Sequence, residues 1–302
     1  MLSVKKMVGL GIYGLVGAVL ILAGIGTVEK GLKEDDRREY ERVVEDMAEL
    51  GNLGFPGYNP LDYKVAFSTG EKDFVVAYNG GDYEVTERKA VYEGLVGSIY
   101  QNGDDFEVVV PAYDTWIATG SKSQLSSVIW HESFHAYQNA VHRVFDSVTD
   151  TILSETKLAD QIDHDSEKRK LYAKELEILG RVTNKENNCD FQELAIEYIH
   201  TAEKRDALLT KEEKASEEFY EMMEGSAYYV EACVVRLENG EPAYKKLYLE
   251  NAGEYAEGNA KYYRHGMLEC MLLDELDPQW KESYHFDKPL TEVIYGISCS
   301  GR

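Results

Sequence analysis

Basic side chains and prolines are scarce in this sequence of 302 residues, and each shortage excludes a class of protein. Lys and Arg number 32 against 55 Asp and Glu, which gives a formal net charge of −23 at pH 7. Since nucleic-acid binding relies on clustered Lys and Arg, nucleic acid is not an expected partner. Only 6 prolines are present, without any repeat, which excludes collagen-like and proline-rich architectures. A hydrophobic content of 44% is nevertheless enough for a folded core.

Cysteine is also rare, and its spacing is uninformative. The chain has four cysteines, at Cys189, Cys233, Cys270 and Cys299. These wide spacings match neither a zinc ribbon nor a CxxC redox motif. Two disulfides outside the cell and four buried thiols inside it both remain open from the sequence.

One long uncharged stretch is present near the N-terminus. Residues 7–28 contain no charged side chain, and a helix of this length spans roughly 33 Å, enough to cross a bilayer core. Lys5 and Lys6 precede it, an order also found in cleaved signal peptides, and Gly24-Ile25-Gly26 offers a weak cleavage site. Because the apolar run is long for a cleaved peptide, we expect 1–28 to be a transmembrane anchor, with a signal segment as the alternative.

The same segment predicts an orientation. The signal-like order of the N-terminus places the rest of the chain outside the cytoplasm. Five basic residues that follow the span oppose this orientation: Lys30, Lys33, Arg37, Arg38 and Arg42. We expect a single-pass protein of the cell membrane with an extracytoplasmic body.

The remaining pattern predicts an α+β fold. A charged helical segment over 29–52 follows the anchor as a juxtamembrane helix. Short alternating runs at 63–67, 74–78 and 106–110 predict a small, mostly antiparallel sheet, and 90–100 is compatible with a short helix. Almost everything after Trp116 has helical periodicity, with helices near 150–160, 166–182, 190–206, 211–238 and 255–276. Residues 53–302 are therefore expected to form one domain.

An HExxH motif, His131-Glu132-Ser133-Phe134-His135, lies in a helix expected to begin at Ser121 or Ser123 and to end near Ser147. Histidines four residues apart project from one helix face, where both imidazoles can reach a single metal ion. Glu132 can take a proton from a water at the metal and pass it to a leaving amine. Apolar flanking residues predict half-buried histidines. The alternative is a coincidental pair on a helix surface.

A catalytic zinc takes three protein ligands and leaves its fourth position open. The longer motif HExxHxxGxxH is absent, since Gln138 and Val141 replace its glycine and third histidine. His142 lies too far along the same helix to reach the metal. A carboxylate further along the chain is therefore expected to complete the site.

Glu224 is the best candidate for this third ligand. It lies in Met223-Glu-Gly-Ser-Ala-Tyr228, where Gly225 and Ala227 keep a helix slim enough to pack tightly against another. Glu193 and Glu197 are rivals, because spacing alone does not separate them from Glu224.

The motif order resembles that of the gluzincin zinc metallopeptidases, particularly the MA-like and aminopeptidase-type members. HExxH is followed by Glu224 in a Glu-Gly-x-Ala context, then by Tyr263-Arg-His-Gly266, which resembles the Tyr-x-x-Gly helix start of that clan. The resemblance covers roughly 100–280. It departs in two respects: 88 residues separate His135 from Glu224, through a charged helical insertion at about 140–210, and no Gly-x-Met-Glu-Asn type motif lies upstream.

The resemblance implies a zincin-like, mainly helical second half with one Zn²⁺ per chain. His131, His135 and Glu224 would bind the metal, Glu132 would be the general base and then acid, and the Tyr263 hydroxyl would contact the oxyanion. Tyr262 and His265 are alternatives for that last role. The strand at 106–110 resembles the edge strand along which peptide substrates lie.

Together these features predict a membrane-anchored zinc metallopeptidase that hydrolyses peptide bonds in peptide or protein substrates. The first alternative is a catalytically inactive, membrane-tethered binding module on the same fold. The second alternative is a helical scaffold protein in which the histidines are incidental.

Overall fold

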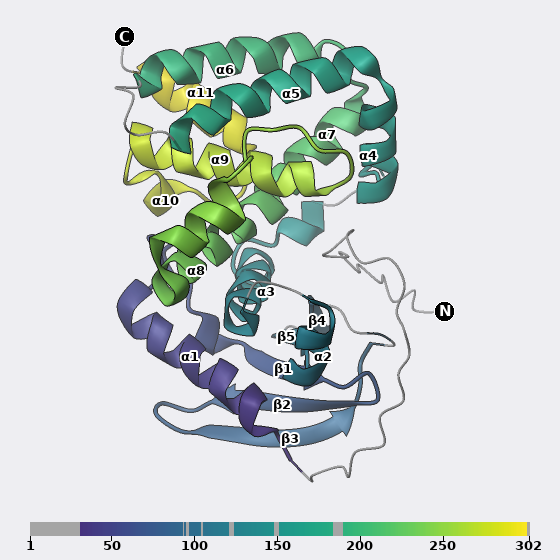
Figure 1. Ribbon diagram of the computed structural model, residues 1–302, viewed down its shortest axis with the longest axis vertical. Helices are drawn as coiled ribbons and strands as arrows, with labels where there is room; N and C mark the ends of the chain where they lie inside the picture. Colours follow the sequence, from purple (N-terminus) through teal and green to yellow (C-terminus); the bar gives the residue numbers. More distant parts are fainter. Residues whose placement is uncertain are drawn as a thin grey trace. The chain divides into compact units, whose positions relative to one another are not determined.

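The computed structural model describes residues 31–92, 94, 97–103, 105–120, 124–147, 151–183 and 190–300, and it has an α+β fold (Figure 1). The strands are β1 Lys64–Ser68, β2 Lys72–Tyr78, β3 Tyr83–Lys89, β4 Ser98–Asn102 and β5 Asp105–Pro111. The α-helices are α1 Glu34–Leu50, α2 Tyr113–Ala118, α3 Leu125–Ala140, α4 Glu155–His164, α5 Ser166–Gly180, α6 Phe191–Asp206, α7 Lys211–Tyr220, α8 Ser226–Tyr244, α9 Ala260–Leu276, α10 Trp280–Ser283 and α11 Leu290–Ser300. Short 3₁₀ segments are η1 Pro60–Asp62, η2 Val144–Ser147 and η3 Arg181–Thr183, and π-helical segments are η5 Glu221–Gly225 and η6 Lys245–Leu249.

These elements form two compact units. The sheet unit consists of the described residues up to Val44 together with Pro60–Ala136. The helical unit consists of Glu45–Asn59 and the described residues from Tyr137 onward. Helices α1 and α3 each begin in the first unit and end in the second.

The sheet has the strand order β3-β2-β1-β5-β4. Its central pair, β1 and β5, is parallel, with Val65 opposite Val108, and the other three pairs are antiparallel. The sheet is therefore mixed: three of its strand pairs are antiparallel, as the sequence predicted for most of them, and the β1–β5 pair is parallel. Both central strands are buried along most of their length, as expected for strands that are covered on both faces.

The sequence patterns identified β1, β2 and β5 but missed β3 and β4. The short helix at 90–100 is wrong: the described residues there form no helix, and β4 begins at Ser98. Strand β5 is also not the edge strand that the resemblance implied, because β4 pairs with its outer side. Whether a strand lies at an edge depends on which other strand pairs with it, which a local pattern does not reveal.

Helix α1 lies on the sheet (Figure 1). Its side chains also cap two other helices. The Tyr40 ring packs edge-on against Tyr83 of β3, with 5.7 Å between centroids. Asp36 Oδ1 accepts a hydrogen bond from the main-chain N–H of Tyr113, the first residue of α2, at 2.6 Å. Glu39 Oε2 accepts one from Ser126 N–H in the first turn of α3, at 3.1 Å. Buried acidic side chains of α1 thus satisfy N–H groups that α2 and α3 leave free at their N-termini.

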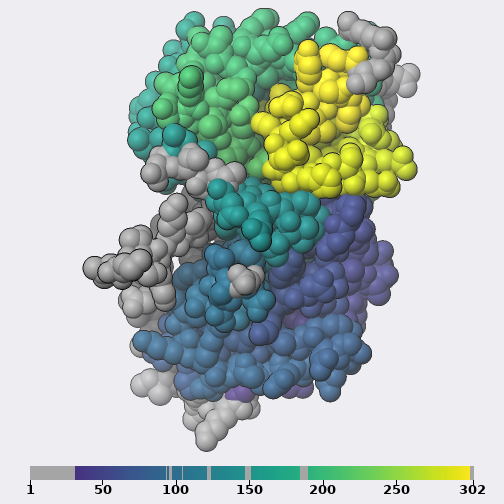
Figure 2. All heavy atoms as spheres, turned by 180° about the vertical axis from the view of Figure 1, so that it is seen from behind, coloured from purple at the N-terminus to yellow at the C-terminus, as the bar shows by residue number. Residues whose placement is uncertain are grey.

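In the helical unit, α9 is the central helix. It contacts η5 and five of the α-helices, namely α5, α6, α7, α8 and α11. Figure 2 shows the C-terminal residues, in yellow, packed against the green residues of the same unit. The expected helices are present near their predicted places. The segment predicted as one helix over 211–238 is α7, η5 and α8, with the π-helical turn between the two α-helices.

The prediction of a single-pass membrane protein with an extracytoplasmic body is corrected. Within the described part of the chain, no helix has the length and apolar character needed to cross a bilayer. The run at 7–28, on which that prediction rested, lies outside the described residues. An α+β fold without a membrane-spanning helix is what the described residues show.

The described cysteines are free thiols. Cys270 is buried, Cys233 is half-buried and Cys299 is exposed, while Cys189 lies outside the described residues. No disulfide links these three residues.

Candidate metal centre

Helix α3, which carries the HExxH motif, is buried all round. Every residue from Leu125 to Asn139 is buried, so α3 is a core helix rather than a surface helix with one apolar face. His131 is 1% exposed and His135 is 2% exposed. The histidines are therefore fully buried, more than their apolar neighbours had suggested.

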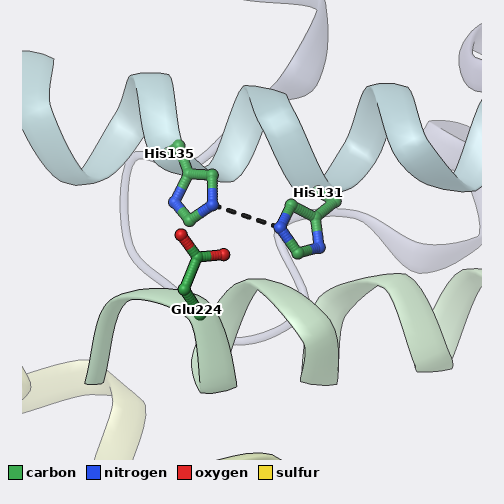
Figure 3. A group of neighbouring side chains, drawn as sticks. All are labelled: His131, His135 and Glu224. Carbon is green, nitrogen blue, oxygen red and sulfur yellow. Dashed lines mark hydrogen bonds between the residues drawn. The ribbon is translucent and has the colours of Figure 1, made fainter. Parts of the chain in front are cut away.

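The two imidazoles converge. The Nε2 atoms of His131 and His135 lie 3.1 Å apart, and Figure 3 shows both rings on the same side of α3. The ring planes are nearly perpendicular, at 77°. Two nitrogen ligands on a tetrahedral zinc, each about 2.05 Å from the metal, are separated by about 3.3 Å. The observed separation thus fits two ligands of one metal ion.

Glu224 points toward this pair from the π-helical segment η5 (Figure 3). His131, His135 and Glu224 each offer a ligand atom, and these atoms all lie within 4.8 Å of one another. All three side chains are buried. This group could hold a metal ion, and two imidazoles with one carboxylate form a donor set used by catalytic zinc sites.

The local structure around Glu224 depends on two glycines. A Cβ at Gly225 would overlap the backbone of Gly266 in α9, and a Cβ at Gly266 would overlap the carbonyl of Glu221. The prediction that Gly225 permits close helix packing is thus confirmed. Single π-helical turns of this kind recur at functional sites, because the extra residue in the turn changes the direction of nearby side chains.

Gln138 connects α3 to η5. Its side-chain amide nitrogen donates hydrogen bonds to the main-chain carbonyl of Met223, at 3.2 Å, and to the hydroxyl of Ser226, at 2.9 Å. These acceptors flank Glu224 in the sequence. Gln138 stands where the longer HExxHxxGxxH motif has glycine, so the residue that breaks that motif orients the segment that carries Glu224.

Glu132, in the middle of the motif, is 1% exposed and lies beside the segment that leads into β4. A Cβ at Gly97 would lie 2.7 Å from Glu132 Oε1, so only glycine fits there without a shift of the carboxylate. Tyr92 is also close: burial raises the pKa of its hydroxyl, and the charge of Glu132 raises it further. Neither Gly97 nor Tyr92 was expected from the sequence, since neither belongs to a motif.

Tyr263 lies in the first turn of α9 and is not part of the metal-ligand group. Its hydroxyl donates a hydrogen bond to Glu155 Oε1 at 3.3 Å. Burial and the charges of Glu155 and Glu224 raise the pKa of Tyr220. Tyr220, a residue that the sequence patterns did not single out, thus lies near both carboxylates.

The rival ligands lie elsewhere. Glu197 forms an ion pair with Arg181, and Glu193 is exposed in the first turn of α6. His142, beyond the end of α3, packs against the rings of Tyr137 and Phe286. Among the described carboxylates, the one grouped with both motif histidines is Glu224.

Comparison with known proteins gives no further identification: no family model, no curated protein and no solved structure matches this chain.

Proposed function

We propose that this protein is a zinc-dependent peptidase. The observation that carries the proposal is the grouping of His131, His135 and Glu224, whose ligand atoms lie within 4.8 Å of one another. The two histidines lie on α3, the helix that also holds Glu132. A chance pair of histidines on a surface helix would not be buried and would not face a buried carboxylate from a segment almost ninety residues away. The HExxH sequence supports the same assignment.

Each residue then has a distinct role. When bound, zinc polarises a carbonyl oxygen and lowers the pKa of a water molecule. Glu132 accepts a proton from that water as general base and returns it to the leaving amine as general acid. Tyr263 donates a hydrogen bond to the developing oxyanion, an interaction typically worth about 3 kcal/mol in the transition state.

The substrate is a peptide in an extended conformation that adds to the edge of the sheet. Strand β4 is the available edge on this side, since β5 is paired on both sides and β4 pairs with β5 alone among the described strands. Main-chain groups of an edge strand bind an extended peptide through ladder hydrogen bonds. Gly97, directly before β4, lies beside Glu132, so a peptide that pairs with β4 passes close to the general base.

Two substitutions test the proposal. Glu132→Gln should retain the zinc but lower the hydrolysis of a quenched fluorescent peptide library by about 10²–10⁴-fold, because only proton transfer is lost. His131→Ala should lose both activity and one equivalent of zinc per chain. Glu193→Gln, an exposed carboxylate of α6, is the control and should match the wild type in both measurements.

The outcomes separate the alternatives. Zinc lost in His131→Ala, with no peptide hydrolysed by the wild type, would indicate a binding module that lacks catalysis. Unchanged zinc content in His131→Ala would mean that the histidines are incidental, and the proposal would be wrong.

A further inference from the structure

A second group of buried metal-ligand side chains lies in the helical unit. Glu221 of η5 and His265 and Glu269 of α9 each offer a ligand atom, and these atoms lie within 4.8 Å of one another. His265 Nδ1 is 3.4 Å from Glu221 Oε1 and 3.6 Å from Glu269 Oε2. His265 is 0% exposed and both carboxylates are buried. None of these residues has a role in the proposed peptidase chemistry.

The orientation of His265 leaves one ring nitrogen directed into the group. Its other nitrogen, Nε2, lies 3.3 Å from Glu175 Oε2, and Arg205 Nε donates a 2.7 Å hydrogen bond to the second oxygen of Glu175. Since a carboxylate only accepts, Nε2 donates a hydrogen bond to Glu175, while Nδ1 faces the carboxylates of Glu221 and Glu269. Histidines that bind metals commonly donate their other N–H to a carboxylate in this way.

Two buried atoms of the group lack hydrogen bonds. Neither His265 Nδ1 nor Glu269 Oε2 has a hydrogen-bond partner in the described part of the chain. Both atoms face the centre of the group, because each lies across from the other. The two atoms lie at ion-pair distance from each other without a hydrogen bond, and a metal ion between them would coordinate both.

The carboxylates are held in place from outside the group. Tyr172 donates a 2.8 Å hydrogen bond to Glu221 Oε1. Glu269 Oε1 accepts hydrogen bonds from the hydroxyls of Tyr198 and Thr291, each at 2.6 Å. These hydroxyls fix the Glu269 carboxylate so that its second oxygen points toward His265. Outer partners of this kind orient metal ligands.

Further buried acidic side chains surround the group. Four buried carboxylates gather here, those of Glu175, Glu217, Glu221 and Glu269. The buried arginine, Arg205, forms ion pairs with Glu175 and Glu217. Glu221 and Glu269 both lie within ion-pair distance of His265. Because buried charges must be compensated, a divalent cation at this point would neutralise both carboxylates.

We propose that Glu221, His265 and Glu269 form a second metal site, which binds a divalent first-row transition-metal ion. One imidazole and two carboxylates suit Zn²⁺, Mn²⁺, Fe²⁺ or Co²⁺ better than Ca²⁺ or Mg²⁺, which prefer oxygen ligands alone. The site joins η5 to α9 at the point where Gly225 and Gly266 bring their backbones together. Its role is to fix η5, the segment that also carries Glu224.

The test uses the full-length His131→Ala variant, in which the first site is disabled and the second is intact. After chelation and reloading with Zn²⁺, the wild type should retain two zinc ions per chain and His131→Ala should retain one. Zinc should also raise the Tm of His131→Ala by several degrees, because an ion that binds only the folded state stabilises it.

A second substitution shows which residues bind the zinc ion that His131→Ala retains. The double variant His131→Ala, Glu269→Gln should retain no zinc, and added zinc should leave its Tm unchanged. Gln has the size of Glu and keeps an oxygen for the hydroxyls of Tyr198 and Thr291, so the packing is preserved. A folded His131→Ala chain without zinc would overturn the proposal, as would a double variant that keeps one zinc ion. Neither measurement depends on peptide hydrolysis, so the proposed activity and the second site can fail separately.

Discussion

The α-carbons of Gly225 and Gly266 lie against each other where η5 packs on α9. A side chain at Gly266 would meet the carbonyl oxygen of Glu221, a main-chain atom that cannot move without distortion of the π-helical turn. Both candidate metal sites depend on this contact, because η5 holds Glu221 and Glu224, and His265 precedes Gly266 directly. The glycine of the Tyr-x-x-Gly sequence thus has a packing role of its own.

Gly266→Ala should therefore destabilise the protein. Overpacking of a tight core site costs about 1–3 kcal/mol, measurable as a lower urea midpoint. Gly296→Ala is the matched control, since Gly296 lies in α11 and no atom lies within 4 Å of the position that its Cβ would take. That change should stabilise the protein by up to about 1 kcal/mol, because alanine favours the helix. Equal midpoints for the two variants would show that the close contact does not matter.

Short-range patterns predicted the parts of this structure that depend on short-range geometry. His131 and His135 could be placed on one face of a helix because four residues make about one helical turn. Gly225 predicted a close helix contact because glycine has few other uses inside a helix. The partner, Gly266, could not be identified from the sequence, because helix pairing is a tertiary property.

The features that the sequence patterns missed depend instead on tertiary pairing between distant segments. Strand β3 has mostly half-buried or exposed side chains, and its pairing with β2 rather than its own composition makes it a strand. Strand β4 was missed because its pairing with β5 is likewise invisible in the local pattern. The second metal site was missed since Glu221 and His265 are far apart in the sequence and meet only through the packing of η5 on α9.

Glu224→Gln tests the third ligand of the first site. The substitution removes an anionic ligand while it keeps the side-chain size, so one equivalent of zinc should bind at least about 100-fold more weakly, as measured by competition with a chelator. The matched control is Glu197→Gln, which removes a partly exposed ion pair with Arg181. An exposed pair contributes about 0–1 kcal/mol, so the control should retain its zinc. Full zinc content in Glu224→Gln, with loss in Glu197→Gln, would reverse the assignment.

Asp36 predicts a pH dependence of stability. Burial raises its pKa to about 6, from 3.8, against the opposing effects of the Tyr113 N–H and of Lys33. Because the folded state holds the proton more tightly than the unfolded state, this contribution to stability is complete below pH 3.8 and is lost as the pH rises through 6. Asp36→Asn cannot ionise and keeps an oxygen for the Tyr113 N–H. Between pH 4 and 7 the free energy of unfolding of the wild type should fall by at most about 3 kcal/mol relative to that of this variant.

The measurement is the free energy of unfolding in urea at a series of pH values, for the wild type and for Asp36→Asn. Asp35→Asn is the matched control on the same helical turn, since Asp35 is more exposed and pairs with Arg38. The difference in the free energy of unfolding between Asp35→Asn and the wild type should show no comparable trend between pH 4 and 7. The prediction would be contradicted if the free energies of unfolding of the wild type and of Asp36→Asn differed by the same amount at every pH.

Tyr263→Phe tests the proposed oxyanion contact, for which the alternative is a purely structural hydroxyl. The structure gives this hydroxyl a hydrogen bond to Glu155, so a structural role predicts a loss of about 1 kcal/mol in stability with normal kcat. A hydroxyl that binds only the transition state predicts a kcat lower by about 10²–10³-fold, with KM and bound zinc nearly unchanged. Tyr262→Phe is the matched control, because the buried Tyr262 hydroxyl has no hydrogen-bond partner in the described part of the chain and its loss should change neither quantity. The test is to measure the steady-state kinetics of both variants and the zinc content of the same samples. A normal kcat in Tyr263→Phe would show that the Tyr263 hydroxyl has a structural role alone.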